Sequence, residues 1–201
     1  MARASQANLF PGFAGWTLAS LLMVAVGATL WTSSAQAEDA AVSFMRRTAN
    51  ELMGAQRQGT AASFVRVINR YGHVPAIGMD ALGSYRKGLR PASRKSYYKG
   101  LVRFIARYAA NESPKYRVSR VEFKGPGVRD GRHVLVDSSV LLADGSRYDV
   151  RWMLVPRGKT FRVRDAQVLG FWISPFLTRL FENYIGENGG RVDALVMALN
   201  R

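Results

Sequence analysis

The chain of 201 residues contains no cysteine, two histidines and 14 acidic residues against 29 basic ones. The absence of cysteine excludes disulfides and zinc sites built on thiolates. Because His73 and His133 are the only histidines and no glycine-rich phosphate loop precedes a helix, neither a metal nor a cofactor is expected. The formal net charge of +15 indicates an anionic partner.

The only strongly apolar stretch near the N-terminus, residues 18–30, is shorter than the roughly 20 residues of a typical membrane span. It follows Arg3 and precedes a small-x-small sequence at residues 35–37, which is the layout of a secretory signal peptide. We therefore expect residues 1–37 to be cleaved, with an uncleaved anchor as the alternative, and residues 38–201 to form one exported domain. For an exported protein, lipid headgroups or an acidic protein are better anionic partners than nucleic acid.

Apolar residues recur at helical spacing through the first half of the mature chain. The longest such segment starts at Pro91, where the missing N–H of the first helical turn costs nothing. Helices are expected over residues 41–56, 60–70, 74–88 (as short turns) and 91–108.

The second half changes to the two-residue period of strands. Four strands are expected over residues 116–124, 132–142, 147–155 and 160–169. The links between them are short and contain glycine, which predicts hairpins and an antiparallel meander. The third strand alternates most cleanly, with Tyr148, Val150, Trp152 and Leu154 on one face and Arg147, Asp149 and Arg151 on the other. One apolar and one charged face predict an α+β fold with helices on a single side of the sheet.

The last forty residues carry more apolar surface than the closing helix of a small domain needs. A strand leads into the apolar run 168–177, which feeds a helix, a glycine-rich turn at 186–190 and a short last helix. This surface must face either a core or an apolar ligand.

Catalytic patterns are sparse. His133, Asp137 and Ser138 are close in sequence, but strand alternation places Ser138 on the apolar face and the other two on the charged face. Asp149 and Asp165 are expected to pair with neighbouring strand arginines. An isomerase would need a carboxylate in apolar surroundings that raise its pKa, and no aspartate is placed there. We therefore do not expect an enzyme.

Four cations recur every four residues along the longest helix, which places them in one row. They are Lys95, Lys99, Arg103 and Arg107. Like charges at this spacing repel and destabilise the isolated helix slightly. The row is either a solvated face or a surface that meets phosphates or an acidic partner.

Four motifs follow one another along the mature chain: GSYRKGLRPASR at 83–94, FIARY at 104–108, VRDAQVLG at 163–170, and a helix pair at 176–199 with the turn NGGRVDAL. In their order and spacing they resemble the MlaC, or toluene-tolerance, family of periplasmic phospholipid-binding proteins. Together they cover nearly the whole mature chain, although each motif alone is weak.

Two segments depart from the family pattern. The long helix starts with Pro91-Ala-Ser-Arg and lacks the family's glutamine. After the last strand, Trp172 stands where a small serine is common, so the shape of the pocket is expected to differ there.

The resemblance implies a helical shell on a curved antiparallel sheet, related to the nuclear-transport-factor-2-like cone, around an apolar cavity. It implies a monomeric periplasmic carrier that holds phospholipid acyl chains between sheet and helices, leaves the headgroup at the mouth and hydrolyses nothing. Its partners would be an outer-membrane lipoprotein complex and an inner-membrane ABC transporter that carries an MCE protein.

The side chains expected to contact lipid are large and apolar. From the helices they are Val74, Ile77, Met79, Leu82, Tyr85, Tyr98, Leu101, Phe104, Ile105 and Tyr108. From the sheet they are Val134, Val136, Val140, Val150, Trp152 and Leu154. From the closing segment they are Phe171, Trp172, Ile173, Phe176 and Phe181. Two alternatives stay open: a carrier of another lipid such as a hopanoid, and a periplasmic adaptor with a packed core that binds only protein.

Overall fold

The computed structural model describes residues 29–201. The signal peptide is expected over residues 1–37, and residues 1–28 of it therefore lie outside the described residues. Residues 36–201 form one compact unit. Within the described part of the chain, no helix combines the length and hydropathy needed to cross a membrane.

Six α-helices are described, and they agree with the helical periodicity of the sequence. They are α1 (Thr29–Gln58), α2 (Ala61–Tyr71), α3 (Val74–Ala81), α4 (Arg94–Glu112), α5 (Ile173–Glu187) and α6 (Val192–Leu199), with short 3₁₀ turns at Gly83–Gly88 and Pro91–Ser93. Side chains cap two of them: the Thr60 hydroxyl accepts from the Ser63 N–H at 3.2 Å, and His73 Nδ1 accepts from the Ala76 N–H at 3.3 Å. These caps fix the starts of α2 and α3 by satisfying N–H groups that have no partner inside the helix.

The sheet is an antiparallel meander, as the glycine-containing links predicted. Its strands are β1 (Val118–Phe123), β2 (Val128–Asp130), β3 (His133–Leu142), β4 (Arg147–Arg157), β5 (Thr160–Val168) and β6 (Phe171–Trp172). The order is β1-β3-β4-β5-β6, and β2 pairs with the start of β3.

The predicted count of four strands was too low because β2 and β6 are short arms of tight turns. The turn before β6 holds Leu169 at φ 52° and Gly170 at φ 83°. Leucine rarely adopts this left-handed conformation, so the sequence did not indicate a hairpin at this position.

The two faces of the sheet are those that the strand alternation predicted. On the charged face, the Arg151 guanidinium donates to both carboxylate oxygens of Asp137, at 2.7 and 2.9 Å. Asp149 lies on the same face but bonds to Lys124 at 2.7 Å, which corrects the expected pairing with arginine. On the apolar face, Val136 stands opposite Trp152.

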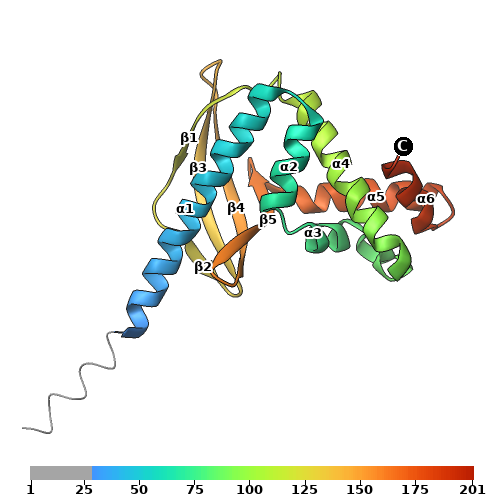
Figure 1. Ribbon diagram of the computed structural model, residues 1–201, viewed down its shortest axis with the longest axis horizontal. Helices are drawn as coiled ribbons and strands as arrows, with labels where there is room; N and C mark the ends of the chain where they lie inside the picture. The colour runs from blue at the N-terminus through green and yellow to red at the C-terminus, as the bar shows by residue number, and fades with distance from the viewer. Residues whose placement is uncertain (1–28) are drawn as a thin grey trace, which may run out of the picture. The chain divides into compact units, whose positions relative to one another are not determined.

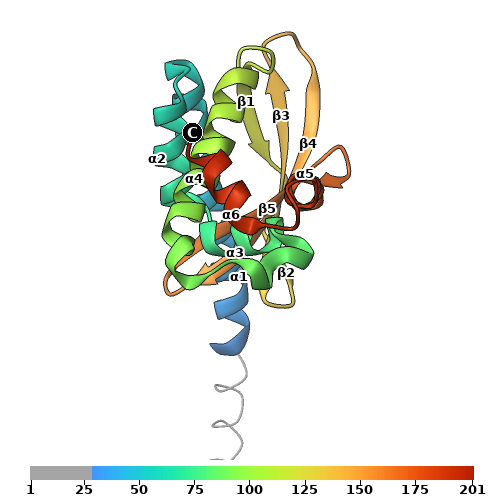
Figure 2. The same cartoon turned by 90° about the vertical axis from the view of Figure 1, so that its right-hand side faces the viewer.

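One core lies between the apolar face of the sheet and helices α1 and α2. Phe44 of α1 contacts Tyr71 of α2 and Phe161 of β5, with ring centroids 5.6 and 5.9 Å apart. Val134 and Val136 of β3 are fully buried in this cluster. Figure 2 shows α2 and α4 on the same side of strands β1, β3 and β4.

A second core holds α3, α4, α5 and α6 together, and Figure 1 shows these helices side by side beyond one end of the sheet. At its centre the Tyr97 hydroxyl donates to the Gly78 carbonyl at 2.7 Å, and burial raises the pKa of Tyr97. Gly100 lets α6 approach α4, because a Cβ there would lie 2.7 Å from that of Leu199. Helix α4 joins both cores, with Leu101 in this one and Ala106 in the first.

Polar contacts anchor the start of α5. Asp165 accepts from the N–H of Ser174 in the first turn of α5 at 3.2 Å, which corrects its expected pairing with an arginine. The neighbouring Arg164 pairs with Asp80 of α3. Because carboxylates are stabilised at a helix N-terminus, Asp165 fixes the direction in which α5 leaves the sheet.

Candidate functional site

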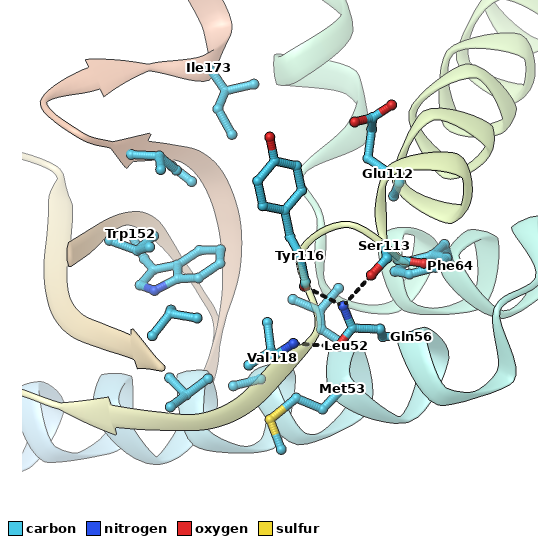
Figure 3. Close-up of a pocket in the computed structure, with 17 residues that line it drawn as sticks. Leu52, Met53, Gln56, Phe64, Glu112, Ser113, Tyr116, Val118, Trp152 and Ile173 are labelled. Carbon is cyan, nitrogen blue, oxygen red and sulfur yellow. Dashed lines mark hydrogen bonds between the residues drawn. The ribbon is translucent and has the colours of Figure 1, made fainter. Parts of the chain in front are cut away.

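An apolar pocket of about 340 Å³ lies between the apolar face of the sheet and helices α1, α2 and α4 (Figure 3). Helices α1, α2 and α4 contribute Ala49, Leu52, Met53, Gln56, Phe64, Ala109 and Glu112, the residue after α4 is Ser113, and the start of α5 contributes Ile173. The segment leading into β1 and the strands contribute Tyr116, Val118, Val121, Val140, Val150, Trp152, Ala166 and Val168. Almost all of these side chains are apolar, so the pocket suits a hydrocarbon ligand.

Gln56 is one of the few polar residues that line the pocket, and its amide is held by hydrogen bonds to backbone. Its Nε2 donates to the carbonyls of Ser113 and Tyr116 at 3.1 and 2.7 Å, and its Oε1 accepts from the Val118 N–H at 2.9 Å (Figure 3). The side chain therefore completes the backbone of the α4–β1 connection and leaves nothing to orient a polar substrate.

The hydroxyl of Ser138 likewise forms its hydrogen bonds within the protein. It donates to the Val150 carbonyl at 3.2 Å and accepts from the Trp152 indole N–H at 2.9 Å. Asp137 lies on the opposite face, paired with Arg151. The predicted separation of this serine from its acidic neighbour is confirmed, so no Ser-His-Asp triad forms here.

Four of the predicted lipid-contacting residues come together in the pocket: Val140, Val150, Trp152 and Ile173. Three others from the sheet, Val134, Val136 and Leu154, are buried deeper in the first core and do not line it. Strand alternation assigned all six sheet residues to one face, but it does not distinguish the part of that face that packs in the first core from the part that lines the pocket.

The helical residues of the predicted set are placed elsewhere. Ten of them pack together in the second core: Val74, Ile77, Met79, Leu82, Tyr85, Tyr98, Leu101, Phe104, Ile105 and Phe181. Their side chains fill the space among α3 to α6 rather than the space beside the sheet. Contact between these residues and lipid stays a prediction.

The remaining predicted residues lie outside the pocket. Tyr108 was expected on the apolar face of α4, but 58% of it is exposed. Phe171 and Phe176 are 78% and 55% exposed, and Trp172 is half-buried in β6 opposite Gln167. Phe171 and Phe176, together with Ile173, which is 48% exposed and does line the pocket, form an apolar surface at β6 and the start of α5.

Helix α1 contributes residues to the pocket that were not predicted for the site. Ala49, Leu52 and Met53 lie in the helix expected over residues 41–56 and line the pocket, yet they were not assigned to the site. The helical period shows that a face is apolar but not which element it will meet. Tyr116 and Val118 lie in the strand expected over residues 116–124 and were not assigned to the site either, although both line the pocket.

The cation row on α4 is exposed at all four positions: Lys95, Lys99, Arg103 and Arg107. Arg107 donates to the Arg201 carbonyl at 3.0 Å. Among residues 40–201 no Asp or Glu side chain pairs with any of the four side chains. The row thus presents unneutralised charge to solvent.

The protein is thus a small α+β domain. Helices cover the apolar face of its antiparallel sheet, and an apolar pocket lies between the two layers. The family model described as MlaC protein matches residues 36–201, and the chain belongs to this family. The resemblance found from the motifs is therefore confirmed.

Among solved structures, the chain is similar to the phospholipid-binding protein from Ralstonia solanacearum, which was solved in complex with a phospholipid. The two share 18% identity with a TM-score of 0.67, and the match covers 81% of this chain and 95% of that one. This likeness confirms the fold. No curated protein matches significantly.

Proposed function

We propose that the protein is a periplasmic carrier that holds phospholipid acyl chains in the apolar pocket. The observation that carries the proposal is the pocket itself, a space of about 340 Å³ walled mostly by aliphatic and aromatic side chains, in which the amide of Gln56 is already bonded to backbone. Membership of the MlaC family and the phospholipid bound by the Ralstonia protein support the same ligand class.

The energetics of such a carrier differ from those of an ordinary binding protein. Each methylene removed from water contributes about 0.8 kcal/mol, so two acyl chains with about 30 methylenes would gain more than non-covalent binding normally reaches. In a membrane, however, the acyl chains are already buried in hydrocarbon and out of contact with water. Transfer between bilayer and pocket is therefore nearly balanced, and weak contacts with the headgroup or with a partner decide its direction.

We propose further that the carrier exchanges lipid with an outer-membrane lipoprotein complex and with an inner-membrane ABC transporter that carries an MCE protein. The apolar surface of Phe171, Ile173 and Phe176 adjoins the pocket. A partner that covers this surface would keep the acyl chains out of water during transfer. The chemistry is binding and release, and no catalytic step is proposed.

Lipid analysis of the purified protein tests this function. We expect native mass spectrometry of protein exported by a bacterial host to show a mass increase equal to one phospholipid, and solvent extraction to release that lipid. A ligand-free protein that also takes up no lipid from vesicles would contradict the proposal. Extraction of a polycyclic lipid in place of phospholipid would keep the carrier and change its cargo.

A further inference from the structure

The apolar face of the sheet changes from pocket wall to packed core along its central strands. On β3, Val140 lines the pocket, whereas Val136 is fully buried in the first core. On β4, which pairs with β3, Val150 lines the pocket and Leu154 is fully buried in the same core. The boundary between the open and the filled part of this face therefore crosses both strands.

Trp152 of β4 stands on this boundary. It lines the pocket and also packs against the first core. Its partners on the neighbouring strands lie on either side of the boundary, because Val136 of β3 belongs to the core and Ala166 of β5 lines the pocket. In Figure 3 the indole extends into the space among the lining residues. The indole thus separates the pocket from the packed part of the sheet face.

The pocket opens to solvent where the residues of its wall are exposed. Tyr116 and Ile173 line it and are 53% and 48% exposed. Beside Trp152, by contrast, the lining residues Val150 and Ala166 are buried. An acyl chain that enters past Tyr116 and Ile173 therefore meets the indole at the inner end of the pocket.

Ser138 holds the indole in its orientation. This serine is buried on the apolar face of β3, and its hydroxyl accepts from Trp152 Nε1 at 2.9 Å while it donates to the Val150 carbonyl at 3.2 Å. An indole that turned away would leave its own N–H and the serine oxygen without partners in apolar surroundings, which is unfavourable. The hydrogen bond therefore favours a single position of the ring.

We propose that Trp152 is the floor of the acyl-chain pocket and sets the length of chain that the carrier accepts, with Ser138 as the residue that positions it. This inference rests on the proposed carrier function. A chain can extend only as far as the indole, because Val136 and its core neighbours fill the space behind the ring. A longer chain must leave methylenes in water at the mouth, and each such methylene weakens binding about fourfold.

A competition between chain lengths tests the floor. Delipidated wild-type protein, Trp152→Leu and Trp172→Leu are equilibrated with vesicles of phosphatidylglycerol that carry chains of 14 or 18 carbons in equal amounts, and bound lipid is quantified by mass spectrometry. Trp172 is the matched control because it is also half-buried but does not line the pocket. We expect wild type and Trp172→Leu to enrich the shorter lipid at least fourfold, and Trp152→Leu to lose about fourfold of that enrichment.

Circular dichroism establishes that each variant is folded. If Trp152→Leu does not fold, Trp152→Phe takes its place, because phenylalanine keeps an aromatic ring but is smaller than tryptophan. The enrichment of the shorter lipid should fall in this variant too, by a smaller factor. A folded Trp152→Phe with the wild-type enrichment would contradict the role of the floor.

A double-mutant cycle tests the positioning role of Ser138. Ser138→Ala should lower the enrichment of the shorter lipid up to about fivefold in the wild-type background, the effect of one hydrogen bond. In the Trp152→Phe background it should change the enrichment little, because phenylalanine has no N–H to hold. An equal effect of Ser138→Ala in both backgrounds would show that the serine does not act through the indole.

The outcomes separate this inference from the carrier function. If wild type binds neither lipid, the carrier function itself is wrong. If wild type binds both lipids in the ratio of the vesicles, or enriches the longer one, the floor is wrong and the carrier function stands. The floor is also wrong if Trp172→Leu changes the ratio as much as Trp152→Leu does.

Discussion

Gln56 Oε1 accepts a hydrogen bond from the backbone N–H of Val118 at 2.9 Å, which ties the last turns of α1 to the first residue of β1. The two residues are 62 positions apart, and both line the apolar pocket. Since the same side chain also holds the Ser113 and Tyr116 carbonyls, one amide sets the position of the whole connection that walls this side of the pocket.

Gln56→Ala should therefore destabilise the fold. It leaves three backbone groups of the α4–β1 connection without their partner, and we expect a loss of about 2 kcal/mol in the free energy of unfolding. Urea denaturation measures this loss. The control is Gln58→Ala, because Gln58 is exposed and its side chain bonds only to that of Arg66; this variant should stay within about 0.5 kcal/mol of wild type. Similar losses in both variants would show that the Gln56 contacts contribute little.

Neighbouring residues of β3 distinguish the pocket face from the charged face. Val140 lines the pocket, whereas Leu141 points to the other face, and both are half-buried. We expect Val140→Asp to lose bound lipid, because a carboxylate in contact with acyl chains must be desolvated or protonated. Leu141→Asp should keep its lipid. The measurement is lipid per protein after purification, with circular dichroism to confirm folding, and an equal loss in both variants would mean that lipid does not occupy this pocket.

The sequence predicted the sheet well because strand alternation depends only on local chemistry. The two-residue period correctly separated Ser138 from Asp137 and Trp152 from Arg151, and these faces follow directly from the pleat. The hairpin at Leu169 could not be predicted, because its turn places a leucine where glycine or asparagine is usual.

The location of the pocket could be predicted only in part. Val150 and Trp152 were identified correctly as apolar sheet residues that face the helices, and both line it. Leu101 and Phe181 show the same apolar pattern as Leu52, yet they pack in a separate core among α3 to α6. Which apolar stripes meet depends on contacts between distant segments, and the period of one segment carries no information about its partner.

The ion pair between Arg151 and Asp137 makes stability depend on acid pH. The hydrogen bond from Arg151 holds the pKa of Asp137 below its ordinary value of 3.8, so the pair stabilises the fold above that pH. This stability is lost as the pH falls through the lowered pKa of the folded state. Both side chains are more than a third exposed, so Arg151→Gln should lose only about 0.5 kcal/mol at pH 7.

The difference between Arg151→Gln and wild type should shrink as the pH falls through the lowered pKa of Asp137, and it should vanish once Asp137 is protonated in both the folded and unfolded states. Urea denaturation at a series of pH values measures it. Arg157→Gln is the control, because Arg157 is an exposed residue of the same strand that forms no ion pair within residues 40–201. A difference that does not change with pH would show that Arg151 acts through packing and not through its charge.

The cation row on α4 should accelerate association with anionic membranes. Lys99 and Arg103 lie at its centre, both exposed and without a carboxylate partner in the described part of the chain. Reversal of both charges, Lys99→Glu with Arg103→Glu, should slow binding to phosphatidylglycerol vesicles in about 10 mM salt and leave little change in about 150 mM salt, because the Debye length falls from about 30 to 8 Å. Stopped-flow fluorescence measures the rate.

The control for this charge reversal is Arg129→Glu with Arg132→Glu, which changes the net charge by the same amount at exposed positions of the β2–β3 hairpin. If the row steers the protein, this control should keep most of the salt dependence. An equal loss in both double variants would mean that only net charge matters, and α4 would then be a solvated face like that of many surface helices. A loss of the salt-dependent rate only in the α4 double variant would identify α4 as the side of the molecule that first meets an anionic partner. The pocket mouth need not lie on that side, because electrostatic steering acts before docking.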